Sequence, residues 1–318
     1  MSDNIHRQIE INAQMAGRRL DQVAAELFAD FSRARLQDWI KSGELTVDGE
    51  KCKPKYRLYG GECLSVTACI NSEQRWRPQN IPIQVVYSDE HLIVINKPNG
   101  LVVHPGAGVP EGTLLNALLH HFPELAMLPR AGIVHRLDKQ TTGLMVVARS
   151  LMAHRHLVEQ LQSRTLGRGY EAVVFGELTG GGSVDRPIGR HPKQRTKMAI
   201  VSGGKEAITH YRVLDRFPAY SHIGCQLETG RTHQIRVHLA AIHHPLVGDP
   251  LYLGRRRWNT GTPIELRAMI ADFPRQALHA QTLSLVHPCS GEKLQWQASL
   301  PADMKMLLEQ LNRYRDNQ

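Results

Sequence analysis

The chain has few of the features that mark secreted and membrane proteins. Its five cysteines, Cys52, Cys63, Cys69, Cys225 and Cys289, form an odd and scattered set without a C-x-x-C pair, unlike a disulfide framework or a zinc site. The opening MSDNIHRQIEINAQ has no apolar run long enough for a signal peptide, and no later window approaches the length of a membrane span. We therefore expect a soluble protein in a reducing cytoplasm, with no membrane partner.

The sequence also lacks the spacing of a metal site, although it contains 17 histidines. His233, His238, His243 and His244 lie close together, but no H-E-x-x-H or comparable pattern appears, and the cysteines do not join them. A metal-dependent nuclease would need a cluster of carboxylates, and the sequence shows none. We assign no metal and expect no cofactor.

The 318 residues, 42% of them apolar, can bury a full core and divide into a small and a larger domain. Positively charged residues outnumber negatively charged ones. The net charge of +9 suits a polyanionic partner, either nucleic acid or an anionic membrane surface, and charge alone does not choose between them. Residues 1–76 contain 11 basic and 11 acidic residues, so the excess lies in the remainder of the chain.

The N-terminal part predicts a compact unit of two short helices and a small β-ribbon. Apolar residues at helical spacing predict a first helix over residues 20–27, and Ser32 is a suitable N-cap for a second over residues 33–41. LTVDGEKC indicates a hairpin that turns at Asp48-Gly49, and a closing strand is expected after Gly60-Gly61.

A polar segment with two prolines, NSEQRWRPQNIP, favours a linker at residues 71–82 between domains at residues 1–70 and 83–318. Strand-like runs follow in IQVVYSDEHLIVINKP, GLMVVA, YEAVVFGEL, THYRVLD, HIGCQLE, ALHAQTLSLV and KLQWQASL. Helical spacing occurs in TLLNALLHHF, LMAHRHLVEQLQSR, THQIRVHLAAI and DMKMLLEQLNRY, and an Arg-rich stretch at 254–275 predicts a surface loop or short helix. Without regular βαβ alternation, the pattern predicts an α+β fold on a mixed or antiparallel sheet.

The segment most suggestive of chemistry is GIVHRLDKQTTGL. Residues 132–134 predict a buried strand that runs into a His-Arg-Leu-Asp turn, followed by a second apolar strand. Asp138 would be held rigidly at this junction beside Arg136, where its charge can be balanced. It could equally be a turn residue whose carboxylate accepts hydrogen bonds from the amides of Thr141 or Thr142.

The pattern H-R-L-D-x-x-T-T-G-L resembles the signature of the ribosomal large-subunit family of pseudouridine synthases. Three further segments match that family in the same order: INKPNGLVVHPG, RGYEAVV, and LETGRTHQIRVH with HPLVGDPLY after it. Near the N-terminus, RRLD, SRAR and SGELTVDG resemble the small S-four-type RNA-binding domain, which typically docks its second helix on RNA. That resemblance implies RNA contacts by Arg33, Arg35 and Lys41.

The family resemblance implies an isomerase that converts uridine to pseudouridine in large-subunit (23S) ribosomal RNA, at several uridines of the intersubunit stem-loop. Asp138 would be the catalytic carboxylate, attacking the ribose carbon or the uracil ring or deprotonating the sugar, and the resemblance leaves these routes open. Arg236 would pair with Asp138, or else contact phosphate. Tyr170 would stack on the target base, or else be a core tyrosine. Arg136 is assigned to the substrate site.

One departure from the family is Gly169, which precedes Tyr170 where the family has a bulkier and often acidic residue, so the resemblance leaves the local loop conformation open but not the tyrosine. A second hypothesis is an RNA-binding ribosome assembly factor that keeps the fold without catalysis. Such a protein would be expected to lack the aspartate or the arginine, and Asp138 and Arg236 are both present. We expect a monomer acting on ribosomal RNA, free or in an assembling large-subunit particle.

Overall fold

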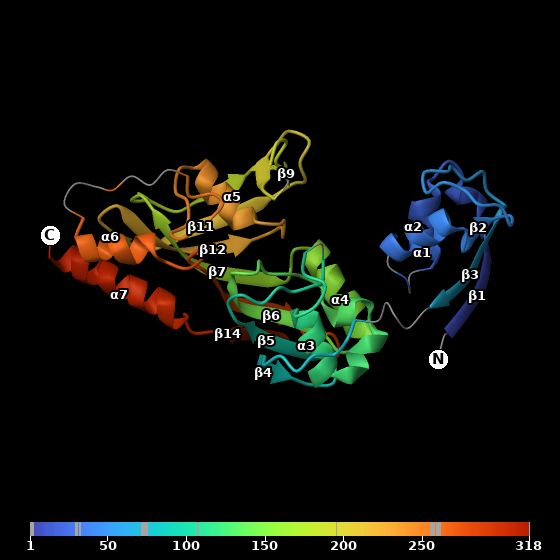
Figure 1. Ribbon diagram of the computed structural model, residues 1–318, viewed down its shortest axis with the longest axis horizontal. Coiled ribbons are helices and arrows are strands. Elements are labelled where there is room, and N and C mark those ends of the chain that lie inside the picture. The colour runs from blue at the N-terminus through green and yellow to red at the C-terminus, as the bar shows by residue number, and fades with distance from the viewer. Residues whose placement is uncertain are drawn as a thin grey trace. The chain divides into compact units, whose positions relative to one another are not determined.

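The computed structural model describes residues 3–317 apart from 29–30, 32, 71–75, 107, 195, 255–257 and 259–261. The chain forms two compact units, Met1–Arg77 and Pro78–Gln318 (Figure 1). The predicted N-cap Ser32 and the first part of the predicted linker lie outside the described residues.

The N-terminal unit packs two helices on a three-stranded antiparallel sheet of order β1-β3-β2. Its elements are β1 (Asp3–Glu10), α1 (Leu20–Leu27), α2 (Arg33–Ser42), β2 (Leu45–Val47) and β3 (Cys63–Ile70). Both predicted helices and the closing strand form. β1 was not predicted, because DNIHRQIE is polar and alternates weakly, yet it pairs with β3 along its whole length.

The predicted hairpin is only partly correct. Val47 and Glu50 exchange main-chain hydrogen bonds across Asp48 and Gly49, whose φ values of 50° and 82° suit a tight two-residue turn. The chain then leaves without forming a second strand, and β2 pairs with β3 instead. Pro54, which cannot donate to a ladder, lies in the segment that follows the turn.

A buried carboxylate joins the two helices of this unit. The Asp21 side chain is fully buried and accepts hydrogen bonds from Arg19 (2.9 and 3.0 Å), Arg33 (2.9 Å) and Gln37 (2.8 Å). Burial alone would raise the pKa of Asp21, but these hydrogen bonds outweigh it and hold the pKa below its usual value. Arg19 and Asp21 of the RRLD motif therefore help to fix α1 against α2.

The larger unit is built on a mixed sheet, and this confirms the predicted fold class. Its strands are β4 (Gln84–Ser88), β5 (Leu92–Lys97), β6 (Thr142–Ala148), β7 (Gly167–Phe175), β8 (Gly182–Asp185), β9 (Ile188–Arg190), β10 (Met198–Ile200), β11 (Ile208–Phe217), β12 (Tyr220–Leu227), β13 (Leu278–Val286) and β14 (Lys293–Gln297). The described residues form a nine-stranded sheet of order β4-β5-β6-β13-β7-β12-β11-β8, with β14 beside β13 and a separate β9-β10 ribbon. Only the β6-β13 pair within it is parallel.

Helices cover both faces of this sheet. They are α3 (Leu114–His121), α4 (Leu151–Gln162), α5 (Gln234–Ala241), α6 (Ile264–Ala271) and α7 (Ala302–Asp316). One buried cluster joins α3, α5 and one sheet face, and includes Leu137 and Tyr170. A second joins α4 to the opposite face. A third joins α6 to α7, which lie side by side in Figure 1; α6 is the short helix allowed for in the Arg-rich stretch.

The strand predicted at residues 132–134 does not form. Pro129–Gly132 is a short 3-10 turn in which Arg130 has a positive φ of 52°, and only Ile133 bridges to β6. At Gly132, φ is +77° and a β-carbon would collide with the carbonyl oxygen of Ala148. The chain therefore reaches Asp138 through a tight irregular segment pressed against β6, rather than along a strand.

Candidate active site

Asp138 lies in the loop that leads into β6, and its turn is closed by the backbone. The amide of Thr141 donates to the main-chain carbonyl of Asp138 at 3.0 Å, so the carboxylate is not used as the turn cap. Instead, Arg236 Nη1 donates to Asp138 Oδ2 at 2.9 Å. The aspartate side chain is 16% exposed, and within the described residues its other oxygen, Oδ1, has no hydrogen-bond partner. The carboxylate is thus anchored by one oxygen and open at the other.

Arg236 is itself held by a second carboxylate. From the buried first half of α5, its Nε and Nη2 donate to Asp249 at 2.8 and 2.9 Å in a bidentate pair. Asp249 also accepts from the amides of Leu251 and Tyr252, and the Tyr252 ring lies 5.1 Å below the guanidinium carbon. Burial would lower the pKa of Arg236, but Asp249 and Asp138 raise it above its ordinary value. Arg236 is therefore a fixed cation beside Asp138.

His233 lies at the start of the same helix with a left-handed φ of 57°. Its Nδ1 shares a hydrogen bond of 2.7 Å with the Tyr252 hydroxyl, and its Nε2 is 3.9 Å from Asp138 Oδ2. Burial lowers the pKa of His233, opposed by the charge of Asp138. Asp249, His233 and Tyr252 were not assigned from the sequence. Only the Gly-Asp-Pro turn at Asp249 could have indicated a buried carboxylate.

Tyr170 projects from β7 into the same core cluster as Leu137 and is 7% exposed. Burial raises the pKa of its phenol, while the charges of Arg168 and Asp138 act on it in opposite directions. β7 runs unbroken through Gly169 and Tyr170, and its pairing with β13 shifts register between Ala280 and Thr282, which lie opposite them. A β-carbon at Gly169 would collide with the Thr282 hydroxyl of β13, which explains the missing side chain.

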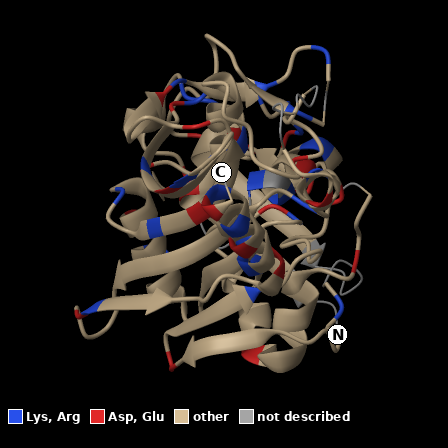
Figure 2. Ribbon diagram, turned by 90° about the vertical axis from the view of Figure 1, so that its left-hand side faces the viewer, with Lys and Arg blue, Asp and Glu red and all other residues tan. Residues whose placement is uncertain are grey.

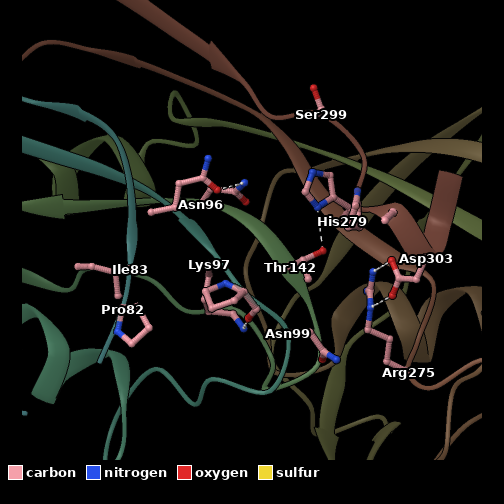
Figure 3. Close-up of a pocket in the computed structure, with 14 residues that line it drawn as sticks. Pro82, Ile83, Asn96, Lys97, Asn99, Thr142, Arg275, His279, Ser299 and Asp303 are labelled. Atoms are coloured by element: carbon pink, nitrogen blue, oxygen red, sulfur yellow. Dashed lines mark hydrogen bonds and ion pairs between the residues drawn. The ribbon is translucent and has the colours of Figure 1, made fainter. Parts of the chain in front are cut away.

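A cavity of about 710 Å³ is lined by residues that include Thr142, the first residue of β6, and Lys97. Figure 3 shows Lys97, Arg275 and Asp303 around it. Lys97 Nζ donates to the carbonyls of Pro98 (2.9 Å), Leu101 (3.0 Å) and Lys139 (3.1 Å). Burial lowers the pKa of Lys97 to about 7, opposed by Asp138. Through the carbonyl of Lys139, the residue after Asp138, Lys97 fixes the course of the loop that carries Asp138.

Two further buried contacts support this loop. Arg275 is fully buried, pairs with Asp303 at 2.6 and 2.8 Å, and lies 3.4 Å from the carbonyl of Gln140. Thr142 and His279 share a hydrogen bond of 2.8 Å, drawn as a dashed line in Figure 3. Burial lowers the pKa of His279 to about 4. The loop is therefore held from β13 and α7 as well as from α5.

The remaining residues assigned from the sequence are placed differently. Arg136 is exposed, and no ion pair of the described residues includes it. In α2, Arg33 pairs with Asp21, Lys41 pairs with Asp38 at 3.2 Å, and Arg35 is half-buried with a partner of its own. The structure brings Asp138, Tyr170 and Arg236 together, and leaves Arg136 free at the edge of the site.

Figure 2 shows basic and acidic residues interspersed along α7, so this helix is not a basic surface. In the part of the chain that the structure describes, no group of three or more His, Cys, Asp or Glu side chains could hold a metal ion. No described helix is both long and apolar enough to cross a bilayer.

Comparisons with known proteins agree with this architecture. The family model described as RNA pseudouridylate synthase matches residues 91–241, and the S4 domain model matches residues 18–62. Taken with the relatives below, this shows that the chain belongs to the RNA pseudouridylate synthase family, with an S4 domain in front of the synthase domain.

The relatives are similar along nearly the whole chain. "Ribosomal large subunit pseudouridine synthase D" of Pseudomonas aeruginosa is 54% identical over 316 residues, covering 99% of both chains. The protein of the same name from Escherichia coli (strain K12) is 52% identical over 310 residues, covering 97% of this chain and 95% of the relative. The solved human RNA Pseudouridylate Synthase Domain Containing 4 has a TM-score of 0.57 and 27% identity, and covers 72% of this chain and 93% of its own.

Proposed function

We propose that this enzyme converts uridines of large-subunit ribosomal RNA to pseudouridine, with Asp138 as its catalytic carboxylate. The observation that carries the proposal is the Asp138–Arg236 pair, in which Oδ2 is bound and Oδ1 is open. Arg236 orients the carboxylate by holding this one oxygen. The open oxygen is then available to a reacting atom.

The reaction breaks the bond between uracil N1 and the ribose, turns the freed base, and joins uracil C5 to the same ribose carbon. The proton on C5 is then lost, and no redox change or phosphate energy is involved. Asp138 can serve as nucleophile or as base in this sequence, and either role requires its ionised form. Tyr170, within electrostatic reach of Asp138, offers an aromatic face on which the base can rest while detached.

The choice of ribosomal RNA is supported by the names of the full-length relatives and by the net charge of +9. The S4 unit would contribute RNA contacts through α2, with Arg33, Arg35 and Lys41 on that helix. Loop uridines need little unstacking to enter the site, and this favours the intersubunit stem-loop as the target, with several uridines modified. We infer that the enzyme acts as a monomer in the cytoplasm, and that binding weakens as salt rises.

The test is to map pseudouridines in total ribosomal RNA of a strain that lacks this protein. We expect several large-subunit sites to be lost, restored by the wild-type gene and by Asp272→Asn, which alters an exposed carboxylate. Asp138→Asn should restore none while binding RNA normally, because an amide is neither a competent nucleophile nor a comparable base. Restoration by Asp138→Asn would contradict the mechanism. A growth or assembly defect rescued by Asp138→Asn without modification would favour the assembly-factor hypothesis.

A further inference from the structure

A second buried guanidinium lies in the same unit and differs from Arg236 in having no carboxylate. Arg168 opens β7 two residues before Tyr170, on the same face of the strand, and is 7% exposed. Its one hydrogen bond runs from Nη2 to the carbonyl of Glu228 at 3.4 Å, and its buried Nε has no partner. Within the described residues, no carboxylate lies at ion-pair distance from Arg168.

The nearby carboxylates are occupied by another arginine. Arg164 donates to Glu206 at 2.7 Å and to Glu228 at 2.9 Å, and the second oxygen of Glu228 is 2.6 Å from His210. Arg164 lies at the surface, with a side chain 36% exposed. Acidic groups are therefore close by in the fold, but they face outward and leave Arg168 unbalanced.

A further cation acts on Arg168 electrostatically. Arg231 is half-buried, donates its Nε to the carbonyl of Glu206 at 2.9 Å, and forms no ion pair among the described residues. Between Glu228 and Arg231 lies Gly230, where a β-carbon would lie 2.5 Å from Arg168 Nη1. Only a glycine lets the guanidinium occupy this place. Burial lowers the pKa of Arg168, Tyr170 opposes this shift, and the charge of Arg231 adds to it.

A buried guanidinium without a carboxylate partner, with a second cation within electrostatic reach, is unfavourable in the free protein. A buried charge is normally paired, as Arg236 is with Asp249 and Arg275 is with Asp303. A uracil carbonyl could fill the open N–H positions but would not balance the charge. A phosphate does both, because the planar arginine fork matches its oxygens.

We propose that Arg168 and Arg231 form a phosphate subsite that receives a backbone phosphate of the RNA next to the uridine placed against Tyr170. The inference rests on the proposed RNA substrate but not on the role of Asp138. The RGYE segment, which contains Arg168, and the TGR segment, which contains Arg231, would then contribute to the affinity for RNA. The subsite would position the strand so that one nucleotide enters the site.

The test measures binding of in-vitro-transcribed large-subunit rRNA fragments against salt concentration. Arg168→Gln should weaken binding by about 10-fold or more and lower the slope of log K against log salt by about one, as loss of one phosphate contact requires. Arg231→Gln should also weaken binding. The double variant should weaken binding by less than the product of the two single effects, because both arginines contact the same phosphate. Arg164→Gln is the matched control, and its slope should equal that of the wild type.

Two further measurements distinguish binding from a structural role. Arg168→Met should leave the Tm of the free enzyme unchanged or raise it, because the charge that it removes is unpaired. A neutral methylphosphonate next to the target uridine should weaken the wild type but not Arg168→Gln. The proposal is overturned if Arg168→Gln keeps the wild-type salt slope, if its effect is confined to the turnover rate, or if Arg168→Met unfolds the protein. Because binding requires no turnover, these outcomes are independent of Asp138→Asn.

Discussion

The two units each contain an aspartate that binds arginine, and the two sites differ in what surrounds the carboxylate. Asp21 in the N-terminal unit is fully buried and receives four hydrogen bonds, from Arg19, Arg33 and Gln37. Asp138 in the larger unit is 16% exposed and receives one, from Arg236. A carboxylate whose oxygens are all engaged holds the fold, whereas one with an open oxygen can react.

The arginines differ in the same way. Arg33 is 53% exposed and donates a hydrogen bond to the buried Asp21. The RNA contact proposed for Arg33 would therefore use its remaining N–H groups. Arg236 is buried between two carboxylates and has the geometry to orient one of them. The pair proposed to react therefore combines a buried arginine with a partly exposed aspartate.

The largest effect is expected from removal of the cation at Asp138. Arg236→Ala would leave the Asp138 and Asp249 carboxylates without their shared partner, so single-turnover rates at saturating enzyme should fall by about 10³-fold or more. Arg236→Lys keeps the charge but loses the fork, so partial rescue is expected. Single-turnover rates of the wild type and of both variants, measured at saturating enzyme, check this expectation.

A phosphate-contact role for Arg236 predicts weaker binding with a nearly normal rate at saturation. If Arg236→Ala reaches the wild-type rate there, the ion pair does not support the chemistry. Arg136, which lies two residues from Asp138 and is exposed, would then be the next cation to test.

A smaller effect is expected at Asp21. Asp21→Ala should lower the free energy of unfolding of the N-terminal unit by about 2 kcal/mol, since several charge-assisted bonds are lost but Arg33 and Arg19 remain partly solvated. Urea unfolding followed by tryptophan fluorescence would report it, because Trp39 is buried in this unit. The control is Asp38→Ala, because the Asp38 side chain is 75% exposed and pairs with Lys41 at the surface. Loss of turnover in a folded Asp21→Ala protein would break the distinction between the two aspartates.

The smallest effect concerns pH and belongs to the larger unit. The pKa of His279 is about 4 in the folded protein, so at pH 5.5 the unfolded chain takes up a proton that the folded state does not. The contribution of His279 to the free energy of unfolding is thus fully present above about pH 6.5. The free energy of unfolding falls on acidification, by about 1 kcal/mol between pH 7.5 and 5.5. Denaturation of wild type and His279→Asn at both pH values checks this, and the variant should show the smaller difference. An equal difference in both proteins would mean that His279 is not held neutral.

Local patterns in the sequence were enough to predict the helices α1, α2, α3, α4, α5 and α7 and most strands of the large sheet. Periodicity reports which face of an element is buried, and that depends on neighbours along the chain. The family motifs also led to Asp138, Tyr170 and Arg236 as candidates. β1 was missed because a polar edge strand shows little alternation, and residues 132–134 were misassigned because an apolar run can lie on a strand without joining its ladder.

What only the tertiary structure decided is how the charges are matched. Asp249 pairs with Arg236 from outside α5, and Lys97 and Arg275 reach the loop of Asp138 from β5 and from the segment before β13. The sequence determined which charged residues are present and on which elements they lie. Pairing depends instead on distances of a few ångströms between side chains from separate elements, and on how far each is withdrawn from water.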